Sequence, residues 1–338
     1  MDWTKSYTST WRIFRVNRRT WADADKLSGA IDASVLKTSD GDTLESGSMS
    51  IAGDFEPDYY RIVLTAEQFG EVARVDVATL LFVETGGEYD YGIDTNSING
   101  YSVLFPASVK AVTVGEYAPA GIDGAMYAGD LLAAAINAPV EVEGSFFLNE
   151  NVVHEFGSTV LSAVWNVLNA GNFVIQIDGR GVVHIRPQPT EPALVIQNAT
   201  KGLLENKITF SADMSGIPNR YIVIDGTNIT VAENNDPGSI VSYSSRGYYV
   251  DAIDTSPTPV NGETYGVYAN RMLKQMSVLN EENEYTREFA PDVYPYSIIK
   301  ASIEGLEGNL KVQSQSIECK NGITVTEKVT KEIPLYEG

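Results

Sequence analysis

The sequence is poor in the residues that most often build metal sites and covalent cross-links. Among 338 residues there are one cysteine, Cys319, and two histidines, His154 and His184. A single cysteine cannot form a disulfide within the chain. Nor can one copy assemble a zinc site of four cysteines, or of two cysteines and two histidines. The sequence therefore excludes an internal disulfide framework and these structural zinc sites.

Positive charge is also scarce. The chain has 24 Lys and Arg against 45 Asp and Glu, which gives a formal net charge of −21. A nucleic-acid-binding surface needs clustered cations that replace the counterions of phosphate groups, and anionic membranes attract basic segments. The charge thus argues against specific binding of DNA or RNA and against membrane anchoring. With 43 % hydrophobic and 20 % charged residues, the composition is that of a folded protein.

Long apolar runs without polar interruption are missing as well. The first 14 residues alternate polar and aromatic side chains and have no signal-peptide core, so we expect no export by that route. The longest charge-free run, 156–177, contains Asn166, Asn169, Asn172 and Gln176, which are costly in lipid. We therefore expect a soluble protein.

The charges are unevenly distributed along the chain. Between Val75 and Glu155 there are twelve acidic residues and one base, Lys110, whereas residues 1–26 hold six bases and three acids. One interpretation is that both segments are ordinary solvated surface. The other is that basic and acidic faces meet neighbouring subunits or a charged cargo.

Hydrophobic periodicity predicts strands at both ends of the chain and helices between them. Short β-rich runs cover 11–16, 48–51, 60–64 and 74–83, with turn residues at 39–42 and 85–88, which favours a small barrel or sandwich. Strands return at 207–210 and 221–224, and a turn is expected at 234–238. Asn321-Gly322 between the alternating runs 310–317 and 323–329 predicts a β-hairpin.

The middle of the chain has helical spacing. Asp123 can cap a helix from about 125 to 137, and a second helix is expected from Ser158 to a stop at Gly171. Runs 173–178 and 182–186 then predict a hairpin that packs on the second helix. A third helix is expected from 263 to 283.

The sequence offers no recognised constellation of catalytic residues. Dinucleotide-binding, phosphate-loop, nucleophile-elbow and metalloprotease motifs are not found, and the run that starts at Asp94 departs from a calcium-binding loop at Ile98 and Phe105. His154 and His184 are interpreted as surface or internally satisfied polar residues. We predict no catalytic, cofactor-binding or metal-ligating residue, no cofactor and no enzymatic activity, and expect no site to depend on either histidine or on Cys319.

The order of these segments resembles the hub proteins of phage tail baseplates and related contractile injection systems. The segments that carry the resemblance are 59–66 with 74–82, 100–104 followed by 127–132, the helix–hairpin run 164–173, 178–182 and 185–187, then 218–223 and 312–317.

The resemblance implies a mainly β fold with α+β insertions: two small antiparallel β-barrels per subunit plus an inserted α/β domain. The implied division is a first barrel at 1–90, an acidic α+β domain at 91–201, a second barrel from 202–240 and 291–338, and a helical insertion at 241–290.

The resemblance also implies a structural role in the virion, at the tail tip, after assembly in the bacterial cytoplasm. Such a hub is a homotrimer that connects the tail tube or distal tail protein to a central spike, fibre or tape-measure protein. DNA, or an effector, passes through its lumen without specific binding. An acidic bore wall would repel phosphate groups and suit such a conduit.

Two other functions remain open from the sequence. The 18 tyrosines and four tryptophans could stack on sugar rings in a host-glycan-binding module, unless Trp11, Trp165 and their neighbours lie in cores. With 45 acidic residues, a cell-wall hydrolase that uses a carboxylate pair is also open.

Overall fold

The computed structural model describes residues 1–39, 41, 43–53, 55–83, 95–113, 115–197, 208–255, 257 and 263–336. The chain divides into two compact units, Met1–Ile208 with Glu284–Val329 and Thr209–Asn283 with Thr330–Gly338. The turn expected at 85–88 and the domain boundaries expected at 90 and 201 lie outside the described residues. The four-part division of the chain stays a prediction.

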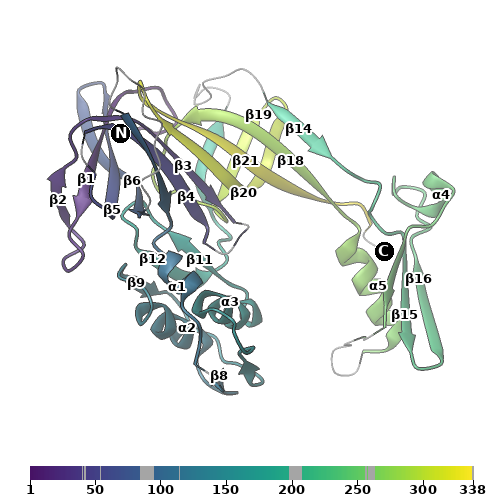
Figure 1. Cartoon of the computed structure of the whole chain (residues 1–338). Coiled ribbons are helices and arrows are strands. Elements are labelled where there is room, and N and C mark those ends of the chain that lie inside the picture. Colours follow the sequence, from purple (N-terminus) through teal and green to yellow (C-terminus); the bar gives the residue numbers. More distant parts are fainter. Residues whose placement is uncertain are drawn as a thin grey trace. The chain divides into compact units, whose positions relative to one another are not determined.

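Strands dominate the fold (Figure 1). The largest sheet has 13 strands, and its main path runs β14-β18-β21-β20-β3-β4-β7-β6-β5-β1-β2, with β19 on β20 and β13 on β19. Their bounds are β1 Thr8–Val16, β2 Asp23–Lys26, β3 Ala30–Thr38, β4 Glu45–Ala52, β5 Asp58–Gln68, β6 Glu71–Phe82, β7 Thr95–Tyr101, β13 Pro192–Gln197, β14 Thr209–Ala212, β18 Val278–Glu288, β19 Ile298–Ile303, β20 Leu306–Cys319 and β21 Ile323–Pro334.

This sheet joins the two strand-rich zones that the sequence predicts. β3 pairs antiparallel with β20, from Ala33 opposite Cys319 to Thr38 opposite Ser314, so the N- and C-terminal strands belong to one sheet. Two separate cores lie on it, one around β1, β3–β7 and one around β18–β20. We expected two separate barrels; no closed barrel is detected among the described residues. The fold is mainly β with a large antiparallel sheet.

An α+β module is inserted between β7 and β13. It contains helices α1 Phe105–Val109, α2 Gly124–Ala133 and α3 Val160–Ala170 and strands β8 Tyr117–Ala118, β9 Val140–Val142, β10 Val152–Val153, β11 Phe173–Ile177 and β12 Val183–Pro187. The Asp123 carboxylate caps α2, as predicted. α3 is capped by Thr159, one residue after the expected Ser158, and ends at Gly171. The predicted hairpin is confirmed, since β11 pairs antiparallel with β12 and shares one core with α3.

The charge-free run 156–177 supplies part of the core of this module. Its apolar side chains Leu161, Val164 and Leu168 are fully buried in the module's core, and Trp165 packs against that core. No helix in the described part of the chain is both long and apolar enough to cross a membrane.

The second unit contains a three-stranded sheet, β16-β15-β17, made of β15 Arg220–Asp225, β16 Asn228–Glu233 and β17 Asp251–Asp254. A short helix α4, Tyr243–Arg246, lies between β16 and β17 in the chain, and α5, Tyr265–Met276, packs Tyr268 and Leu273 against this sheet. β15 and β16 thus lie outside the large sheet, although we expected them within the second barrel.

The third helix is shorter than predicted. We expected it to continue to 283, but α5 ends at Met276 and Val278–Glu288 forms β18. From Asn283 to Arg287 buried and half-buried residues alternate along β18. Pairing with β21 and β14 decides the conformation of this stretch more strongly than its helical propensity does.

Candidate functional site

The β11–β12 turn, residues 178–182, holds the inserted module against β5 and β6. The Asp178 carboxylate accepts the Val182 amide at 2.8 Å, which closes the turn. A Cβ on Gly179 would lie 1.7 Å from the Asp76 carbonyl oxygen of β6, so only glycine permits this close approach. The carbonyl of Arg180 accepts a hydrogen bond from the Trp21 indole at 2.8 Å. We call this contact region the junction.

A buried arginine joins three segments at the junction. Arg61 of β5 donates to the Arg180 carbonyl at 2.9 Å, the Trp21 carbonyl at 3.1 Å and the Asp23 carboxylate at 2.7 Å. Its Nε donates to the Thr79 hydroxyl, which in turn donates to the Gly179 carbonyl. A guanidinium has five N–H donors in a fixed plane, so it can orient several carbonyl groups at once. Arg61 therefore fixes the turn relative to β5 and β6.

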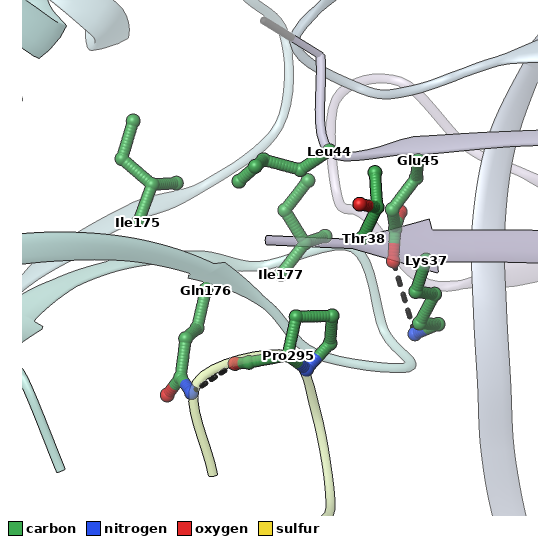
Figure 2. A pocket seen from close by; sticks show the side chains of 8 residues that line it. All are labelled: Lys37, Thr38, Leu44, Glu45, Ile175, Gln176, Ile177 and Pro295. Carbon is green, nitrogen blue, oxygen red and sulfur yellow. Dashed lines mark hydrogen bonds and ion pairs between the residues drawn. The ribbon is translucent and has the colours of Figure 1, made fainter. Parts of the chain in front are cut away.

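A buried ion pair lies on another side of the same hairpin (Figure 2). Lys37 of β3 and Glu45 of β4 are 3.0 Å apart, and each side chain is 2 % exposed. Ile175, Gln176 and Ile177 of β11, Leu44 and Pro295 surround them and enclose a cavity of about 10 Å³. Gln176 donates to the Pro295 carbonyl at 2.7 Å, and this contact ties the hairpin to the loop before β19.

Burial acts on the acidic partner of this pair. Burial raises the pKa of Glu45 and outweighs the neighbouring Lys37 ammonium, which lowers it. The ammonium also lies 5.2 Å from the centre of the Tyr294 ring, a cation–π contact. Because both charges have left water, the pair is costly if either partner is removed.

Next to the ion pair, a hollow of about 370 Å³ opens between the hairpin and the segment 292–297. His184 of β12 lies in its lining with Nε2 3.5 Å from Asp178 and Nδ1 3.2 Å from Glu143. The hydrogen bond with Asp178 raises the pKa of His184. Burial raises the pKa of Asp178, but the His184 and Val182 hydrogen bonds outweigh it and leave this pKa lowered. With carboxylates at both ring nitrogens, His184 links β12 to the turn through Asp178 and to Glu143, the residue that follows β9.

The other two residues that the sequence singles out are buried. His154 contacts the Tyr127 hydroxyl at 3.0 Å, and burial lowers its pKa against the opposing effect of Glu116. Cys319 lies in the core of the N-terminal strands, where burial raises its thiol pKa to about 12. Within the described ranges, no group of three or more His, Cys, Asp or Glu side chains is arranged to hold a metal ion.

The sequence analysis did not identify Arg61, Lys37 or Glu45. For Lys37 and Arg61, the sequence pattern did contain an indication of burial. Lys37 follows Ala33 and Val35 on one face of a strand, and Arg61 lies within the run Tyr59–Leu64, whose other residues are apolar and buried. A lone charge at a core position of a strand indicates a buried polar contact, but its partner cannot be read from the sequence.

The four tryptophans, and two arginines of the N-terminal segment, have partners within the chain. Trp21 is buried in the module's core cluster, and Trp3, Trp11 and Trp165 pack against cores. The Asp58 carboxylate of β5 binds both Arg15 and Arg18, each at 2.6 Å. The basic N-terminal strand is thus partly neutralised within its own sheet.

Comparison with known proteins adds a likeness of fold. No family model matches the sequence, and no curated protein matches it. A tail protein of Neisseria meningitidis MC58 has a similar structure, with a TM-score of 0.66, 11 % identity and coverage of 96 % of this chain and 97 % of that one. The 43 kDa tail protein of prophage MuSo2 from Shewanella oneidensis has a TM-score of 0.62 and 12 % identity, and the match covers 94 % of this chain and 97 % of that one. Prophage tail protein gp18 of Listeria monocytogenes EGD-e has a TM-score of 0.50 and 9 % identity, and the match covers 94 % of each chain.

The chain has the fold of phage tail proteins. The resemblance inferred from the sequence is thereby confirmed at the level of fold. Segments 59–66 and 74–82, which carried the resemblance, form the paired strands β5 and β6, and 164–173 with 178–187 forms α3 and the β11–β12 hairpin. In this fold the junction between module and sheet is a polar contact made by buried hydrogen bonds of Arg61 and Thr79.

Proposed function

We propose that this protein is a structural hub of a phage tail tip or baseplate. The observation that carries the proposal is a tail-protein fold that extends over 96 % of this chain and 97 % of the Neisseria protein, so the likeness is not confined to one domain. In this role the hub connects the tail tube to a central spike or fibre. It forms a homotrimer whose two barrel-like strand zones per subunit give a pseudo-sixfold ring.

The junction has a mechanical role in this proposal. A tail tip transmits force between tube and spike, so its domains must keep their orientation under load. Arg61 joins the module to the sheet, the His184–Asp178 contact stiffens the hairpin, and the Lys37–Glu45 pair stiffens the part of the sheet beside the hairpin. They hold the module as one rigid body with the sheet rather than on a flexible linker.

The charge supports a conduit for DNA. A net charge of −21 disfavours adhesion of a polyanion, and a bore lined by carboxylates lets DNA pass without specific contacts. Because all four tryptophans are buried in or packed against cores, a glycan-binding surface built on them is not favoured.

Light scattering of the purified protein tests the oligomeric part of this proposal. The proposal predicts a mass of about 110 kDa, three times the 36.8 kDa of one chain. Since Arg15 and Arg18 are engaged by Asp58, we expect the mass to persist at about 0.5 M NaCl, where exposed ion pairs are screened. A mass of 36.8 kDa at low and high salt, also in the presence of the tube or spike protein, contradicts the trimer.

A further inference from the structure

The inserted module ends in a two-stranded ribbon on the side away from the large sheet (Figure 1). β8 pairs antiparallel with β10, with Val153 opposite Tyr117 and Val152 opposite Ala118. Farther along the same two segments Ala111 bridges Thr159, and the Val160 amide donates to the Lys110 carbonyl at 2.8 Å. We call the described residues of 109–118 and 152–160 the tip ribbon.

The tip ribbon exposes large apolar side chains. Phe156 is 88 % exposed, Val153 69 %, Val109 63 % and Tyr117 46 %. Tyr117 and Val153 are direct partners across the two strands, so they project on the same face. A single exposed apolar residue is ordinary, but Tyr117 and Val153 lie side by side, Phe156 is on the same ribbon and Val109 ends α1 where the ribbon begins, which concentrates exposed apolar surface of the kind that marks a contact surface.

The ribbon itself is firmly attached to the module. Ala118 and Val160 are buried in the module's core, Val152 packs against it, and His154 on the inner side contacts Tyr127. The exposed side chains therefore do not result from a loose segment. They are held outward by a fixed backbone, which lowers the entropy cost of binding.

The surroundings of the patch are acidic. From 111 to 177 the sequence has seven Asp and Glu and no Lys or Arg. Glu150 and Glu155 are exposed beside the ribbon strands in sequence, and Glu116 precedes Tyr117. An anionic surface repels nucleic acid and anionic lipid, so neither is a suitable ligand. Charge complementarity requires a partner with basic residues.

We propose that the tip ribbon is a docking surface for a segment of another protein that carries apolar side chains flanked by lysine or arginine. A second copy of this chain is a poorer partner, because it has the same acidic excess and its Arg15 and Arg18 are already bound to Asp58. The inference rests on this surface alone and does not depend on the tail-tip assignment.

The test uses calorimetric titration of the full chain with a synthetic 14-residue peptide of leucine and lysine only. Phe156→Ser removes the most exposed apolar side chain, and Glu150→Gln with Glu155→Gln removes two charges. We expect each change to weaken binding at least about fivefold, the size of an effect that marks an energetically important contact. An otherwise identical peptide with glutamate in place of lysine should not bind.

Matched controls separate a site from general attraction. Phe69→Ser changes a phenylalanine that is 93 % exposed on the β5–β6 turn, and Glu304→Gln with Glu307→Gln removes two exposed charges near β19 and β20. These variants should bind like the unchanged protein. The proposal is overturned if the peptide does not bind, if the control variants lose as much affinity as the ribbon variants, or if Phe156→Ser instead abolishes self-association of the chain.

Discussion

At the scale of single residues, the most consequential feature is that opposite charges are buried in pairs where the module meets the sheet. Lys37 and Glu45 form an ion pair beside the β11–β12 hairpin, although their buried polar atoms have no hydrogen-bond partner. A second buried pair, Arg287 with Glu327, lies between β18 and β21 within the sheet and is completed by Tyr285 and Gln315. Such pairs need not add net stability. Lys37 and Glu45 are direct partners on β3 and β4, and residues 175–177 of β11 line the cavity beside them, so a displaced hairpin would expose the buried pair to water. We interpret the Lys37–Glu45 pair as a lock on the orientation of the β11–β12 hairpin.

Breaking this pair on one side should destabilise the protein strongly. Lys37→Met leaves the Glu45 carboxyl alone in the cavity, and we expect a loss of about 3–5 kcal/mol in the free energy of unfolding by urea. The double variant Lys37→Met with Glu45→Met should lose clearly less. Glu284→Gln, which affects an exposed pair with Lys328, should change stability by under about 1 kcal/mol. Equal losses in the single and double variants would refute the lock.

His184 should make stability depend on pH. Its pKa is raised in the folded state, so protonation of His184 stabilises the fold below the ordinary pKa of 6.5, and this contribution disappears as pH rises through the raised value. The stability difference between the unchanged protein and His184→Gln should therefore be larger at pH 6 than at pH 9. Urea unfolding over this range measures it.

His154 provides a control of opposite sign. Its pKa is lowered by burial, so the folded state loses stability as pH falls below 6.5. His154→Gln should remove that loss on the acidic side. If His184→Gln and His154→Gln show the same pH trend, the cross-link assigned to His184 is wrong.

At the scale of elements, we expect the β11–β12 turn to be especially sensitive to substitution. Gly179→Ala would drive a methyl group into the backbone of Asp76, whereas Gly216 has open space around it and no unusual backbone angle. We expect Gly179→Ala to lower the melting temperature by several degrees and to alter Trp21 fluorescence, since the Trp21 indole contacts the adjacent Arg180. Gly216→Ala should change neither. An unchanged melting temperature in Gly179→Ala would contradict the tight contact.

Local elements were predictable where local chemistry decides them. Asp123 and Gly171 mark helix ends, and Asn321-Gly322 marks a hairpin, because capping and turn preferences act over a few residues. The end of α5 was not predictable in the same way. Residues 280–283 are polar and could extend a helix, but pairing with strands distant in sequence places them in β18. The pairing of β3 with β20, about 280 residues apart in sequence, left no local signal either.

At the scale of the whole molecule, the proposed hub has to assemble from copies that each carry a net charge of −21. The chain uses several cations within its own sheet, so like charges on neighbouring copies must be overcome by apolar contacts and by shape. The junction could not be predicted from the sequence because its residues come from β5, β6, the segment around Trp21 and the β11–β12 turn, which only the fold brings together.

Electron microscopy of the purified protein tests the central claim most directly. The hub proposal predicts rings with threefold symmetry and a central hole, either for the protein alone or after addition of the tube protein. Six similar lobes should surround the hole, because each subunit contributes two strand zones. Single particles of 36.8 kDa without a hole under both conditions, or a closed assembly of another symmetry, would contradict the account.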